Sequence, residues 1–234
     1  MRSDLTSMTA VLDGFGTRTS TSDGRAAERR PVPFPDAVPV PVPEEPADAD
    51  PIPVHDLEGT LRRRRSTLHY GQEPVRTGAI LSLVREALGR DREDWGLDAE
   101  AGALEAFVFA FRSEGLAPGL YRVAGGESFR LAGLDELGPL ENLGVQREFS
   151  TAAGIVALYA DLDRSDSWAG AHGYRISASR VAMVTYDLSL RIQALGLVGT
   201  LFGGFIPSSV SHLVHSDGVS RHALLATTYA HPAS

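Results

Sequence analysis

Two long stretches of the sequence repeat apolar residues every three or four positions, which is the spacing of one face of a helix. The first stretch begins near Thr77 and ends at Gly89, and the second runs from Tyr174 to Leu195. The second is nearly apolar all round in its middle, so we expect a central helix that is buried in the core or at a subunit interface. The apolar positions are Ile80, Leu83, Val84 and Leu88 in the first stretch, and Ile176, Val181, Val184, Leu188 and Ile192 in the second.

Shorter apolar runs, rich in β-branched and aromatic residues, predict the strands of a sheet. The run Ala103 to Phe111 is apolar at nearly every position and should be an internal strand. The pair Gly125-Gly126 predicts the turn of a hairpin. Because helices and strands interleave irregularly, with too few βαβ units for a doubly wound sheet, the fold class should be α+β. The other expected strands are 120–123, 128–131, 154–162, 197–205 and 222–230, and short helices are expected after a capping Asp56, with Leu57 and Leu61 on one face, and over 208–215.

Prolines set the first quarter of the chain apart, because nine of the 14 lie between Pro31 and Pro53. This composition favours an extended polyproline conformation and cannot support a core. We expect residues 1–54 to be a disordered Pro-rich tail, with the alternative that part of it lies across the folded domain as an extended strap. The domain itself is expected over residues 55–234.

Composition narrows the classes of function. The formal net charge of −8 disfavours a nucleic-acid binder, because phosphate recognition needs a basic surface. Cysteine is absent, which excludes disulfides, thiolate nucleophiles and Cys-ligated metal centres. Since no run approaches the roughly 18 apolar residues of a membrane helix, we expect no membrane segment and a cytoplasmic protein. We also expect no metal site, since His212, His215 and Asp217 lack a convincingly spaced fourth ligand.

The segment RRSTLHY, residues 64–70, resembles the opening segment of the nitroreductase superfamily. Its chemistry suits flavin mononucleotide (FMN), because a guanidinium grips a phosphate while a serine hydroxyl and nearby amides hold the ribityl chain. The alternative for the arginine run is a solvated helix end, where positive charge is favourable. The resemblance implies FMN contacts from Arg64, Arg65, Ser66 and Leu68.

A second segment, Ala101-Gly102-Ala103-Leu104, precedes a predicted strand, and Pro118-Gly119-Leu120-Tyr121 follows that strand. The pair of motifs is similar to those of the azoline dehydrogenases of thiazole- and oxazole-containing peptide biosynthesis. The resemblance implies that Ala101 and Gly102 line the flavin. Those relatives typically carry Pro-Ser where this chain has Ala99-Glu100, which is a departure beside the expected flavin.

A third segment brackets the end of the long predicted helix. Gly173-Tyr174-Arg175 opens that helix, and Phe202-Gly203-Gly204-Phe205 lies in the strand after it, an arrangement similar to the closing signature of the superfamily. A glycine pair lets backbone amides approach the isoalloxazine ring, so the resemblance implies that Gly203 and Gly204 contact the flavin. The alternative for the pair is a bulge or tight packing of strands.

Together the three segments imply an FMN-binding homodimer, with a central mixed or antiparallel sheet flanked by helices and the long helix at the dimer interface. The implied reaction oxidises an azoline to an azole in a modified precursor peptide. A cyclodehydratase complex is the further partner that this reaction implies.

At the position of the base for this reaction, the sequence differs from the azoline dehydrogenases that it resembles. In azoline dehydrogenases a Lys-Tyr pair acts shortly before the long helix, and it aligns here with Trp168-Ala169, in a sequence without lysine. His172 and Tyr174 are the nearest groups able to carry a proton, and they are our candidates for catalysis. Two alternatives stay open: a non-catalytic scaffold subunit of the same fold in a peptide-modifying complex, and an NAD(P)H-dependent reductase of the nitroreductase type.

Overall fold

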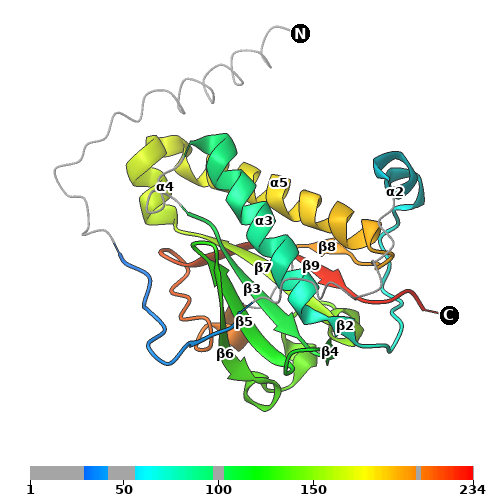
Figure 1. The fold of residues 1–234 in the computed structure, drawn as a ribbon. Helices are drawn as coiled ribbons and strands as arrows, with labels where there is room; N and C mark the ends of the chain where they lie inside the picture. The colour runs from blue at the N-terminus through cyan, green and yellow to red at the C-terminus, as the bar shows by residue number, and fades with distance from the viewer. Residues whose placement is uncertain (1–28, 42–55, 97–102, 204–206, 234) are drawn as a thin grey trace, which may run out of the picture.

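The computed structural model describes residues 29–41, 56–96, 103–203 and 207–233. Its centre is a seven-stranded sheet with the strand order β1-β6-β5-β3-β7-β9-β8, in which every neighbouring pair is antiparallel (Figure 1). The α+β class expected from the sequence is confirmed. The strands of this sheet are β1 (Val38–Pro39), β3 (Glu105–Ala110), β5 (Gly119–Ala124), β6 (Glu127–Gly133), β7 (Gly154–Ala160), β8 (Leu201–Phe202) and β9 (His222–Tyr229), while β2 (Val75–Arg76) and β4 (Ser113–Glu114) form a separate parallel pair.

Helices cover one face of the sheet. In Figure 1, α3 (Thr77–Trp95) and α5 (Gly173–Ala194) cross this face side by side, and α4 (Leu162–Ala169) packs at the first turn of α5. Near the other end of α5 lies α2 (Leu57–Arg63). The last helix, α6, is the single turn Pro207–Val210. On the opposite face, 3-10 turns over residues 134–137, 140–142 and 147–151 cover the sheet.

The internal strand β3 divides the core into two layers by simple alternation. Ala106, Val108 and Ala110 belong to the layer that contains α3 and α5, whereas Phe107 and Phe109 belong to the layer on the opposite face. All five side chains are fully buried. Successive side chains of a strand point to opposite faces, so a run that is apolar at every position has both faces buried. The prediction of an internal strand here is confirmed.

Helix α3 is longer than the sequence predicted. The expected stop at Gly89 is wrong, because the helix continues to Trp95 and ends at Gly96, whose φ of 57° lies in the left-handed region. The added turns carry the buried Asp91, whose carboxylate accepts hydrogen bonds of 3.1 and 2.5 Å from the Arg180 guanidinium of α5. Breaking such a pair is costly, so the helix continues past a glycine that costs only about 1 kcal/mol.

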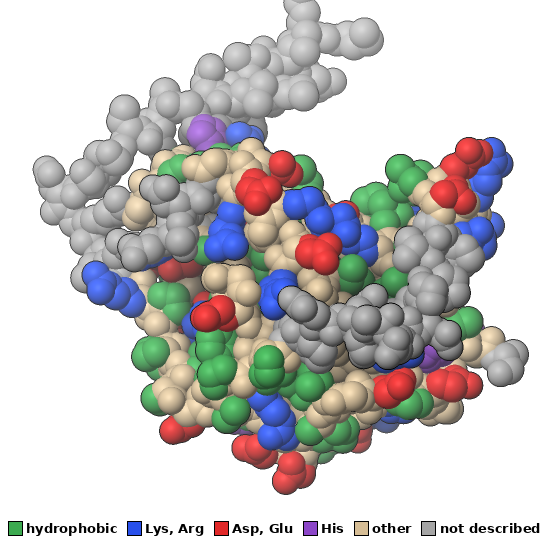
Figure 2. Space-filling view, viewed as in Figure 1, with side chains coloured by type: hydrophobic (Ala, Val, Ile, Leu, Met, Phe, Trp, Pro, Cys, Tyr) green, Lys and Arg blue, Asp and Glu red, His purple; other side chains and the backbone are tan. Residues whose placement is uncertain are grey.

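Charged side chains also link α3 to α5 at the surface. Asp187 of α5 lies 2.5 Å from Arg90 of α3 and 3.1 Å from Arg191, and Glu86 of α3 lies 3.3 Å from Arg191. Positive and negative side chains are interspersed over this face in Figure 2. Because exposed ion pairs contribute little individually, these surface pairs add less to the contact between the two helices than the packing of their apolar stripes and the buried Asp91–Arg180 pair.

Helix α5 buries one side within the chain and exposes the other. Val184 and Leu188 lie in the core, whereas Tyr174, Met183 and Tyr186 are 55%, 59% and 42% exposed. The helix therefore occupies the central position that its sequence predicted. Its all-round apolar character leaves an uncovered face in the single chain.

Helix α2 begins where the sequence predicted. The Asp56 carboxylate accepts a 2.8 Å hydrogen bond from the Gly59 amide, which caps the first turn. Leu57 and Leu61 share one face, as expected, but they are 65% and 45% exposed. This apolar pair is a second uncovered surface close to the end of α5.

The glycine-rich segment after α5 is less regular than the predicted strand 197–205. Among residues 197–203, the part of this segment that the structure describes, only Leu201 and Phe202 pair with β9, as β8, while Val198 forms an isolated bridge with Ala230. The predicted helix 208–215 is likewise wrong in extent, because it shortens to α6 followed by turns. His215 has a φ of 48°, which is incompatible with a continuing helix.

Part of the Pro-rich segment lies on the domain. Residues 29–41, here called the strap, lie against the domain, and Val38 and Pro39 pair with the edge of the sheet at β6 (Figure 1). The Val40 amide donates a 2.9 Å hydrogen bond to the Ser128 carbonyl. Over these residues the structure replaces the expected disordered tail with an extended strap, the alternative that the sequence left open.

Candidate functional site

The loop after α2 meets the segment after α5, although more than 130 residues separate them. Ser66 forms a parallel bridge with Gly199, and the Thr200 hydroxyl donates a 2.7 Å hydrogen bond to the Thr67 carbonyl. The Thr200 amide in turn donates to the Thr228 hydroxyl of β9 at 2.9 Å. The first and third segments of the sequence resemblance are thereby joined to one edge of the sheet.

Tyr70 fixes the end of this loop. Its side chain is buried, and its hydroxyl lies 3.0 Å from the Thr228 hydroxyl. Burial raises the pKa of Tyr70, while hydrogen bonds from Thr228 and Thr200 offset part of the effect, so the phenol stays protonated at neutral pH. The next residue, Gly71, donates from its amide to the His231 carbonyl at 2.8 Å. The loop is therefore held at both ends.

Alternate residues of this extended loop face opposite sides. Arg65, Thr67 and His69 line a cavity of about 430 Å³. The Arg65 guanidinium folds back onto its own backbone, where it donates to the carbonyls of Arg62 and Arg64 at 3.2 and 2.8 Å. Arg65 is therefore the only one of the four predicted FMN contacts in this loop that lines this cavity.

The other three predicted contacts do not line this cavity. The Leu68 side chain is partly buried and packs against the core layer that contains Phe107. The half-buried Arg64 guanidinium and the exposed Ser66 hydroxyl make no hydrogen bond to the described part of the chain. These two polar groups are available to a ligand.

Two glycines near this loop, Gly199 and Gly203, differ in the space that the structure leaves for a side chain. A β-carbon on Gly199 would lie 2.1 Å from the Thr228 carbonyl oxygen, so the packing of the strands admits no side chain there. A β-carbon on Gly203 would have its nearest neighbours at 3.9 Å, and its φ lies outside the left-handed region. The fold requires the first glycine but leaves room for a side chain at the second. Exposed backbone at Gly203 suits a ligand that lies against the main chain.

These residues fit the requirements of FMN. An uncommitted guanidinium can pair with a phosphate, an uncommitted hydroxyl can bond the ribityl chain, and open backbone can approach the ring. Of the predicted contacts, Arg64, Ser66 and Gly203 therefore lie on one connected edge. Ala101, Gly102 and Gly204 lie outside the described residues.

The predicted catalytic residues lie at the opposite end of α5. His172 ends a 3-10 turn, with its Nδ1 atom 3.1 Å from an Arg175 guanidinium nitrogen, and Tyr174 is exposed on the first turn of α5. A helix of 22 residues spans about 33 Å, and the Arg64 loop lies near its last turn. Within one chain, the structure does not bring His172 or Tyr174 to the Arg64–Leu68 loop.

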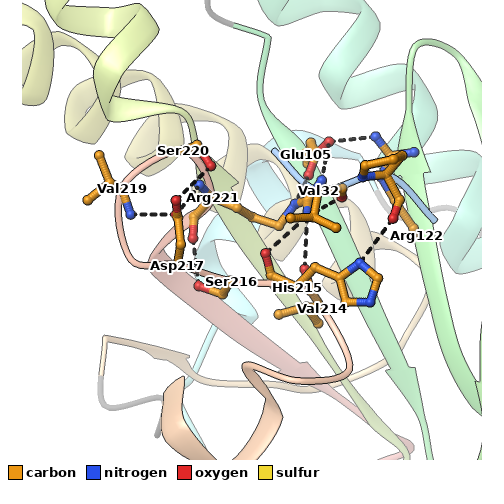
Figure 3. A network of polar contacts seen from close by, with 11 residues as sticks. Val32, Glu105, Arg122, Val214, His215, Ser216, Asp217, Val219, Ser220 and Arg221 are labelled. Atoms are coloured by element: carbon orange, nitrogen blue, oxygen red, sulfur yellow. Dashed lines mark hydrogen bonds and ion pairs between the residues drawn. The ribbon is translucent and has the colours of Figure 1, made fainter. Parts of the chain in front are cut away.

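Sequence reasoning missed a second polar site around Arg221, drawn in Figure 3. Arg221 is 2% exposed, and its guanidinium lies 2.6 Å from one Glu105 carboxylate oxygen. Arg122 pairs with the same carboxylate at 2.5 Å. Glu105 opens an otherwise apolar internal strand, and a charge at such a place needs a buried partner. A glutamate at the start of this apolar strand was the feature of the sequence that could have indicated the site.

The carboxylate of Glu105 is ionised in this site. Burial alone would raise the pKa of Glu105, but hydrogen bonds and positive charge from Arg221 and Arg122 outweigh burial and hold the pKa below its usual range. Burial raises the pKa of the neighbouring Tyr159 phenol strongly, against a smaller opposing effect of Arg221. The site therefore holds one carboxylate between two cations beside a neutral phenol.

The residues considered for a metal site have other roles. The His215 ring stacks on Phe34 of the strap, and the Asp217 carboxylate accepts hydrogen bonds from the Val219 and Arg221 amides. Across the described residues, no group of three or more His, Asp or Glu side chains is placed to hold a metal ion. In the same part of the chain, no helix has the length and apolarity needed to cross a membrane.

Comparison with known proteins identifies the architecture. No protein-family model matches this sequence, and no curated protein matches it. Among solved structures, a proposed nitroreductase from Anabaena variabilis matches with a TM-score of 0.68 at 21% identity, over 95% of this chain and 47% of that one. A proposed nitroreductase from Ralstonia eutropha matches with a TM-score of 0.58 at 17% identity, over 90% of this chain and 97% of that one.

A third structure, nitroreductase A from Vibrio parahaemolyticus, matches with a TM-score of 0.51 at 15% identity, over 76% of this chain and 67% of that one. The chain thus spans about half the length of the Anabaena protein and almost all of the Ralstonia protein. At these identities the likeness concerns the fold. The antiparallel sheet and its long central helix are those of the nitroreductase fold, which this chain shares.

Proposed function

We propose that this chain is an FMN-dependent oxidoreductase that oxidises azolines to azoles in a ribosomally made, modified peptide. The observation that carries the proposal is the junction of the Arg64–Leu68 loop with Gly199 to Gly203, where Arg64 and Ser66 have uncommitted polar groups. The nitroreductase fold and the names of the structural neighbours, which include nitroreductases, support flavin chemistry at this junction. The azoline substrate rests on the sequence resemblance around Pro118-Gly119-Leu120-Tyr121.

In this proposal the chain's own residues bind and orient the reactants. Arg64 would hold the FMN phosphate, Ser66 would hold the ribityl chain, and the open backbone at Gly203 would leave room for the ring. When bound, FMN would supply the hydride acceptor that the oxidation of the azoline needs, and oxygen would be the final oxidant. His172 or Tyr174 takes the Cα proton.

Dimer formation is part of the proposal. The exposed Tyr174, Met183 and Tyr186 of α5, with Leu57 and Leu61 of α2, form uncovered apolar surface of the kind that a two-fold interface buries. In a homodimer built on this face, the start of α5 in one chain can contact the partner chain. We propose that the start of α5 in one chain lies near the Arg64 loop of its partner, so that the dimer brings together groups that are a helix length apart within one chain.

One observation favours a second candidate, a non-catalytic scaffold of the same fold. The chain has no lysine, and Trp168-Ala169 stands where azoline dehydrogenases carry their Lys-Tyr pair. An NAD(P)H-dependent reductase is the third candidate, in line with the nitroreductase neighbours.

One experiment separates the three. The purified chain is incubated with FMN and a thiazoline-containing peptide, and mass spectrometry records the loss of two hydrogens per ring. The proposal predicts bound flavin and FMN-dependent loss of two hydrogens. Bound flavin that NADPH bleaches, without peptide oxidation, would support the reductase, and failure to bind FMN would support the scaffold.

A further inference from the structure

The strap rests in a groove that the domain builds. The Phe34 ring stacks on the His215 ring with centroids 4.5 Å apart, and it meets the Phe107 ring edge-on at 6.0 Å. The guanidinium carbons of Arg221 and Arg122 lie 4.8 and 5.4 Å from the Phe34 centroid. Stacking and cation–π contacts both favour an aromatic occupant. We call these four surrounding side chains the aromatic socket.

Contacts within the domain organise the aromatic socket. Besides Glu105, the Arg221 guanidinium donates to the carbonyls of Val214 and His215 at 3.1 and 3.2 Å (Figure 3). Glu105 also holds Arg122. Since none of these contacts involves the strap, the domain itself holds the two arginines of the socket in place.

The rest of the strap is bound mainly through its main chain. The carbonyls of Val32 and Pro33 each accept a 3.1 Å hydrogen bond, from Arg221 and His215 respectively. The side chains of Val32 and Val38 are 55% and 60% exposed. Main-chain hydrogen bonds, a short strand added to a sheet edge and one side-chain anchor are how proteins recognise extended peptides.

The strap fills only part of this groove. A cavity of about 660 Å³ continues beside Arg30 and Pro31, and its wall includes Arg122 and Tyr159. The Tyr159 hydroxyl and the Arg122 Nε atom are buried without a hydrogen-bond partner among the described residues. The cavity reaches Ala103, directly after the segment that the sequence resemblance places at the flavin.

We propose that the groove from the aromatic socket along β6 to this cavity binds an extended peptide with an aromatic residue between prolines. The strap is its resident occupant, and a peptide supplied in trans has to displace it. A tethered segment competes at an effective concentration in the millimolar range, so the strap excludes weakly bound peptides. Identification of the displacing peptide as the substrate rests on the proposed function, whereas the groove itself does not.

The test uses the full chain and a fluorescent peptide with the sequence of residues 29–41. Fluorescence anisotropy is measured for the wild type, for Phe34→Ala, and for Val32→Ala as a control that changes an exposed side chain of the same segment. Phe34→Ala should bind the peptide at least about tenfold more tightly than the other two, because its own strap competes less well. A peptide with alanine in place of phenylalanine should not bind.

A second variant replaces residues 31–40 by a Gly-Ser segment of equal length, so that no strap competes. Circular dichroism and thermal melting identify which variants are folded, and the wild type itself should bind the peptide weakly and saturably. Absence of saturable binding in every folded form would overturn the proposal, as would equal affinity in the wild type and the Gly-Ser variant. FMN content of the same samples separates the two proposals, because loss of flavin binding alone leaves the groove intact.

Discussion

Two regions of this molecule carry arginines, and they differ in what those arginines contact. The Arg221 guanidinium is buried and is satisfied by Glu105 and by main-chain carbonyls. The Arg64 guanidinium is half-buried and, like the Ser66 hydroxyl beside it, makes no hydrogen bond to the described residues. Since a buried charge must find partners within the fold, the first arginine maintains structure. The second is free to serve a ligand.

Removal of Arg221 should have the largest effect on stability. Arg221→Leu leaves the Glu105 carboxylate in the core with Arg122 as its remaining cation, so the free energy of unfolding should fall by about 3–5 kcal/mol. Urea denaturation measures the change. Arg147→Leu, at an exposed arginine, is the control and should stay within about 0.5 kcal/mol of the wild type. Equal losses in both variants would show that the Arg221 cluster does not hold the fold.

Gly199 and Gly203, near Arg64, allow the same comparison between a residue that the fold requires and a residue that could contact a ligand. Gly199→Ala should cost about 1–3 kcal/mol of stability, because its β-carbon meets the Thr228 carbonyl. Gly203→Ala should change stability by less than about 0.5 kcal/mol while it weakens FMN binding. Thermal melting and flavin titration of both variants provide the comparison. If Gly203→Ala left the flavin affinity unaltered, the flavin ring would not lie against the Gly203 backbone.

The pH dependence of stability should follow Glu105. Because the folded pKa of Glu105 lies below its usual value, its ionisation stabilises the fold above the unfolded pKa, near 4.5, and this contribution is lost as pH falls through the folded pKa. The free energy of unfolding should therefore fall more between pH 7 and pH 3 for the wild type than for Glu105→Gln, as denaturation curves at each pH would show. Identical pH slopes would mean that Arg221 and Arg122 do not lower this pKa.

Much of the fold could be predicted because its signals are local. Apolar periodicity located α3, α5 and the internal strand β3, and the Gly125-Gly126 turn located a hairpin. The stop predicted at Gly89 failed because a long-range ion pair, Asp91 with Arg180, overrides a local helix breaker. Composition likewise made the strap look like a tail, since Phe34 is held by side chains distant in sequence.

The candidate site was only partly predictable for a related reason. The sequence named Arg64 and Ser66 as ligand contacts, but it could not show that Arg65 turns back onto its own loop. Arg221 was missed because its role depends on Glu105, 116 residues away. Motifs can be found from residue spacing along the chain, but which polar groups already have a hydrogen-bond or ion-pair partner can be found only from the three-dimensional structure.

Titration of FMN into the purified chain tests the central claim most directly. The wild type should bind FMN and quench its fluorescence. Arg64→Ala should bind about 10 to 100 times more weakly, because a charge-assisted hydrogen bond is worth about 1.5–3 kcal/mol. Arg62→Ala, which removes an exposed arginine paired with Glu58, should bind like the wild type. A wild type that does not bind FMN, or an Arg64→Ala variant that binds it equally well, would contradict the account.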